Sequence, residues 1–98
     1  MNGQEREYFL LAIDKTAYSN FLVWWGPNDS GYTTNIEQAG IYTEERINSD
    51  RSYYDNDECV PVPLEDIKLL NTVHAATYSL HNINQLNVLD KLRKYKQK

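Results

Sequence analysis

The sequence is poor in cysteine and has no long apolar run. Cys59 is the only cysteine among the 98 residues, so an internal disulfide is excluded and the chain fits a reducing compartment. The longest apolar runs, residues 8–13 and 21–25, are far shorter than the roughly 20 residues that cross a bilayer. The polar N-terminus also lacks the basic and apolar regions of a signal peptide. We therefore expect a soluble, cytoplasmic protein that does not enter the membrane.

Signatures of catalysis and of cofactor binding are also lacking. The sequence has no glycine-rich phosphate loop, no nucleophile elbow and no Cys/His cluster at metal spacing. His74 and His81 have no carboxylate or cysteine beside them, which makes a weak pattern for a metal site. Cys59 lies between acidic residues and an apolar run, which raises the pKa of a thiol and disfavours a nucleophile. We expect a binding protein that is not an enzyme and that uses no cofactor or metal.

The overall composition is that of a small folded domain. Hydrophobic residues make up 41% and charged residues 24% of the chain, close to the average for globular proteins. A chain of 98 residues can fill one core but not two, so residues 1–98 are expected to form a single domain. Because a domain of this size buries only about two thirds of its unfolded surface, a homo-oligomer such as a homodimer is also expected.

Charge is distributed unevenly along the chain. Residues 1–66 carry 4 basic and 13 acidic side chains, whereas residues 67–98 carry 6 basic and 1 acidic side chain. The basic tail fits the C-terminal end of a helix, where positive charge complements the helix dipole. The acidic remainder would repel a long polyanion, so binding to duplex nucleic acid is not expected.

Two short runs of aromatic and aliphatic residues predict buried strands. Residues 8–13 and 21–25 have the length and composition of strands, and we expect them to pair antiparallel. The second run is followed by Gly, Pro, Asn, Asp and Ser at residues 26–31, which indicates a tight turn.

Two short helices are predicted after this turn. Thr34 and Glu37 have the spacing of a capping box, which predicts one helical turn over residues 35–39. Gly40 stands where such a helix needs a left-handed residue to end. A second helix is expected to begin at Thr43, with two glutamates in its first turn.

The following segment mixes loop, strand and helix signals. Residues 48–58 are polar and acidic and are predicted to form a loop. Residues 59–62 are apolar but interrupted by proline, which favours a strand at a sheet edge. A helix is expected from about Pro63, because proline suits the first helical position. Residues 71–81 fit either a helix or a strand.

The C-terminus predicts an amphipathic helix. Asn82 and Gln85 again have the spacing of a capping box. The apolar residues after them share one broad helical face: Leu86, Val88, Leu89, Leu92 and Tyr95. Together these elements predict an α+β fold, in which a small antiparallel sheet of about two to four strands is combined with short helices and a C-terminal amphipathic helix.

The candidate ligand site lies at the two adjacent tryptophans. In a strand Trp24 and Trp25 point to opposite faces, so one can fill the core while the other stays at the surface. An indole beside a loop rich in backbone N–H groups suits a small anionic or nucleotide ligand, and Arg46 and Arg51 could supply positive charge. Alternatively, Trp25 packs under the loop or against a partner subunit. The predicted ligand-binding residues are Trp24, Trp25, Asn28, Ser30, Tyr32, Thr33, Arg46, Arg51, Tyr53 and Tyr54.

A second candidate surface is the acidic segment that carries Tyr53 and Tyr54. Tyrosine offers a large contact area at small entropic cost, and the acidic residues around the pair suit a basic partner protein. The alternative is a solvated loop without a binding role.

The chain resembles small uncharacterised proteins encoded by bacteriophages and prophages. The shared pattern is W-x-P at residues 25–27, G-Y-T at 31–33, A-G-x-Y-T at 39–43 and a later V-P at 60–61. Small phage proteins often counter host defence, so the resemblance implies a protein that sequesters a nucleotide second messenger in the host cytoplasm. The alternative that it implies is an inhibitor or adaptor that docks on a host defence protein through the acidic, tyrosine-rich segment.

Overall fold

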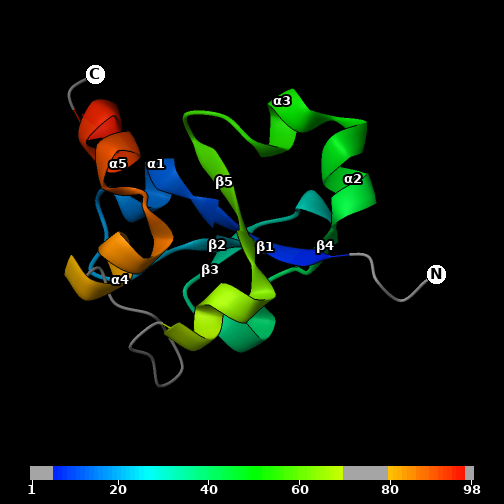
Figure 1. Ribbon diagram of the computed structural model, residues 1–98, viewed down its shortest axis with the longest axis horizontal. Coiled ribbons are helices and arrows are strands. Elements are labelled where there is room, and N and C mark those ends of the chain that lie inside the picture. Colours follow the sequence, from blue (N-terminus) through cyan, green and yellow to red (C-terminus); the bar gives the residue numbers. More distant parts are fainter. Residues whose placement is uncertain (1–5, 70–79, 97–98) are drawn as a thin grey trace.

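The computed structural model describes residues 6–69 and 80–96, which form an α+β fold as predicted (Figure 1). The strands are β1 (Glu7–Ala12), β2 (Trp24–Trp25), β3 (Tyr32–Thr33), β4 (Tyr42–Thr43) and β5 (Cys59–Pro63). The α-helices are α1 (Ile13–Thr16), α2 (Glu44–Ser49), α3 (Arg51–Tyr54), α4 (Leu80–Leu86) and α5 (Leu89–Lys96). Three 3-10 helices complete the described elements: η1 (Pro27–Asp29), η2 (Ile36–Gln38) and η3 (Leu64–Leu69).

The strand β1 lies at the centre of an antiparallel sheet. On one side it pairs along its length with β5, from Tyr8 opposite Pro63 to Ala12 opposite Cys59. On the other side its two ends pair with β4 and with β2, and β3 pairs in turn with β2. The expected antiparallel pairing of the first two strands is therefore confirmed, and β5 pairs only with β1 among the described residues, as an edge strand should.

The number of strands differs from the prediction of two to four, because the described residues form a five-stranded sheet. The strands β2, β3 and β4 each contain two residues. Strands this short leave no alternating pattern in the sequence, because alternation becomes visible only over about four residues or more.

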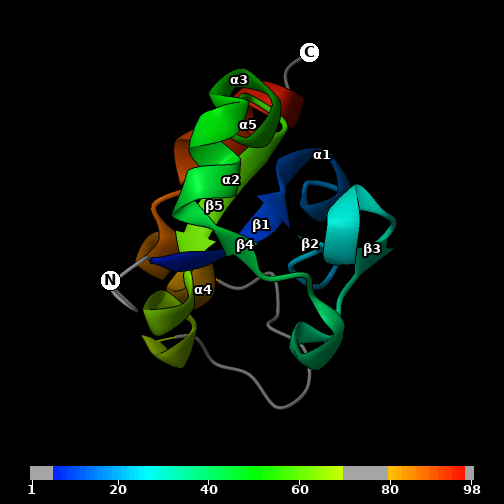
Figure 2. The same ribbon diagram turned by 90° about the vertical axis from the view of Figure 1, so that its right-hand side faces the viewer.

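Both faces of the sheet are buried at β1, which explains why this strand has a continuous apolar sequence. Phe9 and Leu11 belong to one core cluster, whereas Leu10 between them belongs to a second. Residues of α4 and α5 cover the first cluster, and residues of α2 and α3 cover the second. In Figure 1 the helix α5 lies beside α1, while α2 and α3 lie on the opposite side of β5. Figure 2 shows α2 and α3 next to each other.

The predicted helix after the turn is present only as the 3-10 helix η2. Its cap is Asn35 rather than Thr34, since the Asn35 side chain accepts a hydrogen bond from the Glu37 N–H at 2.9 Å. Gly40 does not have the expected left-handed conformation. It is required by close packing instead, because a Cβ there would lie 2.6 Å from the Gly26 carbonyl oxygen.

Residues 48–58 were predicted to be a loop, and this prediction is wrong for α3. The buried ring of Tyr54 anchors this short helix to the sheet, and such a tertiary contact leaves no local helical pattern. The helix predicted from Thr43 is confirmed as α2, where the Thr43 hydroxyl accepts a hydrogen bond from the Arg46 N–H at 3.1 Å. The helix predicted from Pro63 begins at Leu64 as the 3-10 helix η3.

The C-terminal helix is broken in two, which the sequence prediction missed. Asn87 has a φ of 58°, a left-handed conformation that asparagine tolerates better than most residues, and it separates α4 from α5. Asn82 is not a cap, because it lies inside α4 and is fully buried. The predicted apolar face is nevertheless confirmed, since Val88 and Leu92 are buried in the first core cluster. Of the undecided segment, residues 71–79 lie outside the described part of the chain.

Within residues 6–69 and 80–96, no helix has the length and apolar character needed to cross a membrane. The same residues contain no group of three or more His, Cys, Asp or Glu side chains arranged to hold a metal ion. His74 lies outside the described residues, so the structure places no second histidine relative to His81.

Cys59 is buried in the second core cluster and is 1% exposed. Burial, with smaller contributions from Asp55 and Asp14, raises the pKa of its thiol to about 12. The expected rise in the pKa is therefore confirmed, and the thiol stays protonated at neutral pH.

This raised pKa predicts a loss of stability in alkali. The unfolded chain loses the thiol proton near the ordinary pKa of 9.0, whereas the folded protein holds it until about 12. The contribution of the protonated thiol to the free energy of unfolding is complete below pH 9. It is lost between pH 9 and pH 12, at up to about 1.4 kcal/mol per pH unit. Urea unfolding of the wild type and of Cys59→Ala should show a stability difference that shrinks as pH rises. A difference that stays constant across this range would contradict the assignment.

Candidate functional site

The two tryptophans have the opposite environments that strand geometry predicts. Trp24 is fully buried in the first core cluster, with its ring centre 5.8 Å from that of Phe9. Trp25 lies on the other face of the sheet and is half-buried against the second cluster. Trp24 is therefore a core residue that cannot contact a ligand, although it was among the predicted site residues.

A surface hollow of about 140 Å³ lies beside Trp25, and we call it the aromatic hollow because three of its lining residues are aromatic. It is lined by Trp25, Asp29, Gly31, Tyr32 and Tyr53. Trp25 and Tyr32 are opposite each other on β2 and β3, so their side chains share one face of the sheet. Tyr53 reaches the hollow from α3, with its ring centre 5.5 Å from that of Trp25. Tyr32 is 53% exposed and Tyr53 is 48% exposed, so both rings are available to a partner.

Two buried tyrosines pack against Trp25. Tyr42 and Tyr54 lie 6.4 Å and 6.0 Å from Trp25 between ring centres, and 5.8 Å from each other. These separations and tilted arrangements are favourable for aromatic pairs. Trp25 therefore rests on a packed aromatic pair, and Tyr53 also contacts Tyr54, with ring centres 5.0 Å apart.

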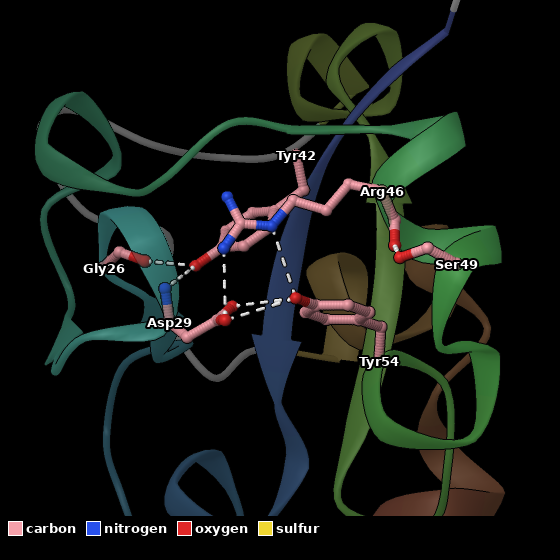
Figure 3. Close-up of polar contacts among 6 residues, drawn as sticks. All are labelled: Gly26, Asp29, Tyr42, Arg46, Ser49 and Tyr54. Atoms are coloured by element: carbon pink, nitrogen blue, oxygen red, sulfur yellow. Dashed lines mark hydrogen bonds and ion pairs between the residues drawn. The ribbon is translucent and has the colours of Figure 1, made fainter.

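The turn beside the hollow is held by a hydrogen-bonded clamp (Figure 3). The Tyr42 hydroxyl donates to the Gly26 carbonyl at 2.6 Å and accepts from the Asp29 N–H at 2.8 Å. The Asp29 carboxylate accepts from the Tyr54 hydroxyl at 3.1 and 3.2 Å and pairs with the Arg46 guanidinium at 3.1 Å. The clamp joins η1 to β4, α2 and α3, which are distant in sequence.

The clamped turn contains backbone strain. Asn28 and Asp29 have φ values of 54° and 60°, in the left-handed region that residues other than glycine seldom adopt. Each such residue costs about 1 kcal/mol or more and persists only where its surroundings hold it. The contacts to Asp29 provide that restraint, so the turn presents Asp29 to the hollow in a fixed position.

Both predicted arginines make contacts within the protein. The Arg46 guanidinium lies 4.9 Å from the Tyr42 ring centre and donates to the Tyr54 hydroxyl at 3.3 Å. The hydrogen bond to Tyr54 and the nearby Asp29 raise the pKa of Arg46. Arg51 contacts Asn48 and Asp55 and does not line the hollow. Neither arginine is directed at a ligand in the hollow.

The turn also offers fewer N–H donors than the sequence suggests. The N–H groups of Gly26, Asp29 and Ser30 already donate within the protein, and Pro27 has none. The predicted residues Asn28 and Ser30 are exposed but do not line the hollow. The Thr33 hydroxyl accepts a hydrogen bond from the Asn35 N–H at 3.0 Å. The geometry therefore gives less support to an anionic ligand than the sequence does.

Carboxylates act electrostatically on the two exposed tyrosines. Burial raises the pKa of Tyr53, and Asp29 and Asp50 are among the groups that raise it further. Burial likewise raises the pKa of Tyr32, with added contributions from Asp14 and Glu58. We call these four carboxylates the acidic rim. A basic group also approaches the hollow, since the Lys15 ammonium lies 5.2 Å from the Tyr32 ring centre.

Sequence reasoning missed three residues of the site. Asp29 and Gly31 lie in the turn that composition identified, but neither was selected as a ligand contact. Tyr42 was not selected as a site residue, and no local signal reveals its hydrogen bonds to the turn. Tyr54 was selected, but it is buried and serves the clamp rather than the exposed surface.

Comparisons of the chain with known protein families, with curated proteins and with solved structures found no match. The chemistry of the site is therefore the basis on which its function is inferred.

Proposed function

We propose that this protein is a binding protein whose aromatic hollow and acidic rim dock on a basic segment of a partner protein. The observation that carries the proposal is the exposure of Tyr32 and Tyr53 beside Trp25 and Asp29, with three further carboxylates acting electrostatically on the two tyrosines. Tyrosine and tryptophan are enriched in protein interfaces. Complementary charge speeds association and selects among partners.

A protein partner fits the hollow better than a nucleotide does. The hollow of about 140 Å³ is smaller than the roughly 300–1,000 Å³ of most small-molecule sites. Phosphate groups would meet the Asp29 carboxylate there, while Arg46 is paired within the clamp. Sequestration of a nucleotide second messenger remains the second candidate, because the exposed rings of Tyr32 and Tyr53 offer stacking faces.

The resemblance to phage and prophage proteins extends this proposal to a biological role. It suggests a small phage protein that acts in the host cytoplasm as an inhibitor or adaptor of a defence protein, without catalysis. Self-association into a homodimer through the same tyrosines would compete with such a partner, and sedimentation would detect it.

The proposal predicts selective binding of basic peptides. Fluorescence anisotropy should show binding to lysine- and arginine-rich peptides, weaker binding at high salt, and none to acidic peptides of equal length. Tyr32→Ala and Tyr53→Ala should each weaken binding about tenfold or more, as expected for interface tyrosines. Tyr18→Ala is the matched control, because Tyr18 is 72% exposed, packs against Tyr95 of α5 and does not line the hollow.

Two results would contradict the docking proposal. One is equal binding of acidic and basic peptides. The other is a loss of peptide affinity in the Tyr18→Ala control as large as that in Tyr32→Ala and Tyr53→Ala. Cyclic and ADP-ribose nucleotides test the second candidate through the melting temperature, because a ligand at a hundredfold excess over its Kd adds about 2.7 kcal/mol. Stabilisation by a nucleotide that disappears in Tyr53→Ala would favour sequestration.

A further inference from the structure

The aromatic hollow has the composition of a cage for an organic cation. Its walls include the side chains of Trp25, Tyr32 and Tyr53, and Asp29 adds a carboxylate. Aromatic faces attract cations that lie within about 6 Å of the ring centre, and such rings recognise quaternary ammonium groups. We propose that this hollow binds a methylated ammonium head group. The inference rests on the proposed docking function and names the chemical group that the hollow would recognise.

The size of the hollow fits a head group rather than a whole ligand. Its volume of about 140 Å³ is well below the roughly 300–1,000 Å³ of sites that enclose a whole small molecule. A compact tetrahedral ammonium fills such a space. The hollow is open at the surface, so an attached chain can leave it toward solvent.

The hydrogen bonding of Asp29 favours a methylated cation over a primary ammonium or a guanidinium. Its carboxylate oxygens already accept from the Tyr54 hydroxyl and pair with Arg46. Asp29 therefore supplies negative charge more readily than new hydrogen bonds. A primary ammonium or guanidinium brings N–H groups that need acceptors, whereas a trimethylammonium brings none.

Tyr32 of the hollow and the nearby Tyr42 each already have a cationic side chain of the protein close to their rings. The Lys15 ammonium lies 5.2 Å from the Tyr32 ring centre, and the Arg46 guanidinium lies 4.9 Å from that of Tyr42. Arg46 offsets part of the charge of Asp29, but Asp14, Asp50 and Glu58 keep the surroundings of the tyrosines acidic. Ring faces and charge thus both favour a cation.

An NMR titration with small ammonium compounds tests the cage directly. The probes are blocked trimethyl-lysine, choline, blocked unmodified lysine and 3,3-dimethylbutan-1-ol, which has the shape of choline without its charge. The indole N–H signal of Trp25 should shift with trimethyl-lysine and choline, and that of buried Trp24 should not. Trp25→Phe identifies the two signals. The neutral alcohol and unmodified lysine should each bind about tenfold or more weakly.

The two cationic probes also distinguish the source of the ligand. Tighter binding of trimethyl-lysine than of choline would identify a methylated side chain of a partner protein, and the reverse order would identify a free choline-type compound. Either order supports the cage, because the head group is the same.

Variants separate the ring walls from other effects. Tyr32→Ala and Tyr53→Ala should each weaken choline binding about tenfold, whereas Tyr53→Phe keeps the ring and should keep most of the affinity. Tyr18→Ala should leave binding unchanged. The inference is overturned if the neutral alcohol binds as tightly as choline, or if no probe moves the Trp25 signal in the folded protein.

The outcomes keep the cage and the docking function apart. If basic peptides bind but no ammonium probe shifts Trp25, the cage is wrong and the docking proposal stands. If the ammonium probes bind and basic peptides do not, the docking proposal is wrong and the cage stands as a site for a small cation.

Discussion

Trp24→Ala is expected to lower the free energy of unfolding by about 3–5 kcal/mol. The side chain is fully buried between the sheet and the C-terminal helices, so its removal leaves a cavity that the surrounding residues fill only in part. The loss is comparable to much of the total stability of a small domain, which is about 5–15 kcal/mol. Urea unfolding monitored by circular dichroism measures the effect.

The neighbouring tryptophan is the matched control. Trp25→Ala removes the same atoms from a half-buried position and should cost less than half as much. If Trp24→Ala does not fold, Trp24→Phe provides the measurement, because it keeps an aromatic ring in the core. It also removes the Nε1–H group, which has no hydrogen-bond partner among the described residues. This variant should fold with a loss of about 1–2 kcal/mol. Equal effects of the Trp24 and Trp25 alanine variants would contradict the assignment of the two faces.

Tyr42→Phe is expected to lower the free energy of unfolding by about 2–4 kcal/mol, although only one oxygen atom is removed. The Gly26 carbonyl and the Asp29 N–H would both lose their partner, at about 1–3 kcal/mol for each buried polar group. The left-handed residues of the turn would also lose a restraint, so Asp29 would no longer be held beside the hollow. Binding of basic peptides and of choline should fall with the stability.

The control for this change is Tyr18→Phe. Its hydroxyl is on a largely exposed ring, so its removal should change stability by no more than about 0.5 kcal/mol. Both variants lose the same atom, and urea unfolding compares them directly. A loss in Tyr42→Phe as small as that in Tyr18→Phe would show that the clamp does not hold the turn.

Local signals in the sequence predicted the framework of the fold. The apolar run that became β1 is buried on both faces, and its antiparallel pairing with the next run was predicted from the two runs. The cap at Thr43 predicted α2, because the Thr43 hydroxyl accepts a hydrogen bond from the N–H of Arg46, only three residues later in the chain. Features of this kind depend on neighbours in the chain, so a single sequence reveals them.

Elements defined by tertiary contacts were predicted poorly. The helix α3 is anchored by buried Tyr54, and the break between α4 and α5 depends on the backbone of Asn87. Gly40 was assigned to a helix end, but it is required because the backbone at Gly26 passes close to it. None of these contacts leaves a periodic pattern in the sequence.

The sequence by itself determined an α+β framework with one tryptophan in the core and the other outside it. Only the tertiary structure decided which tryptophan is buried and what charge the exposed one meets. The contacts that decide this join Tyr42 to Gly26, 16 residues apart, and Tyr54 to Asp29, 25 residues apart. Electrostatic character depends on which groups meet in space, and such long-range pairings placed Asp29 at the hollow and left Arg46 paired with it, where the sequence predicted an anion site.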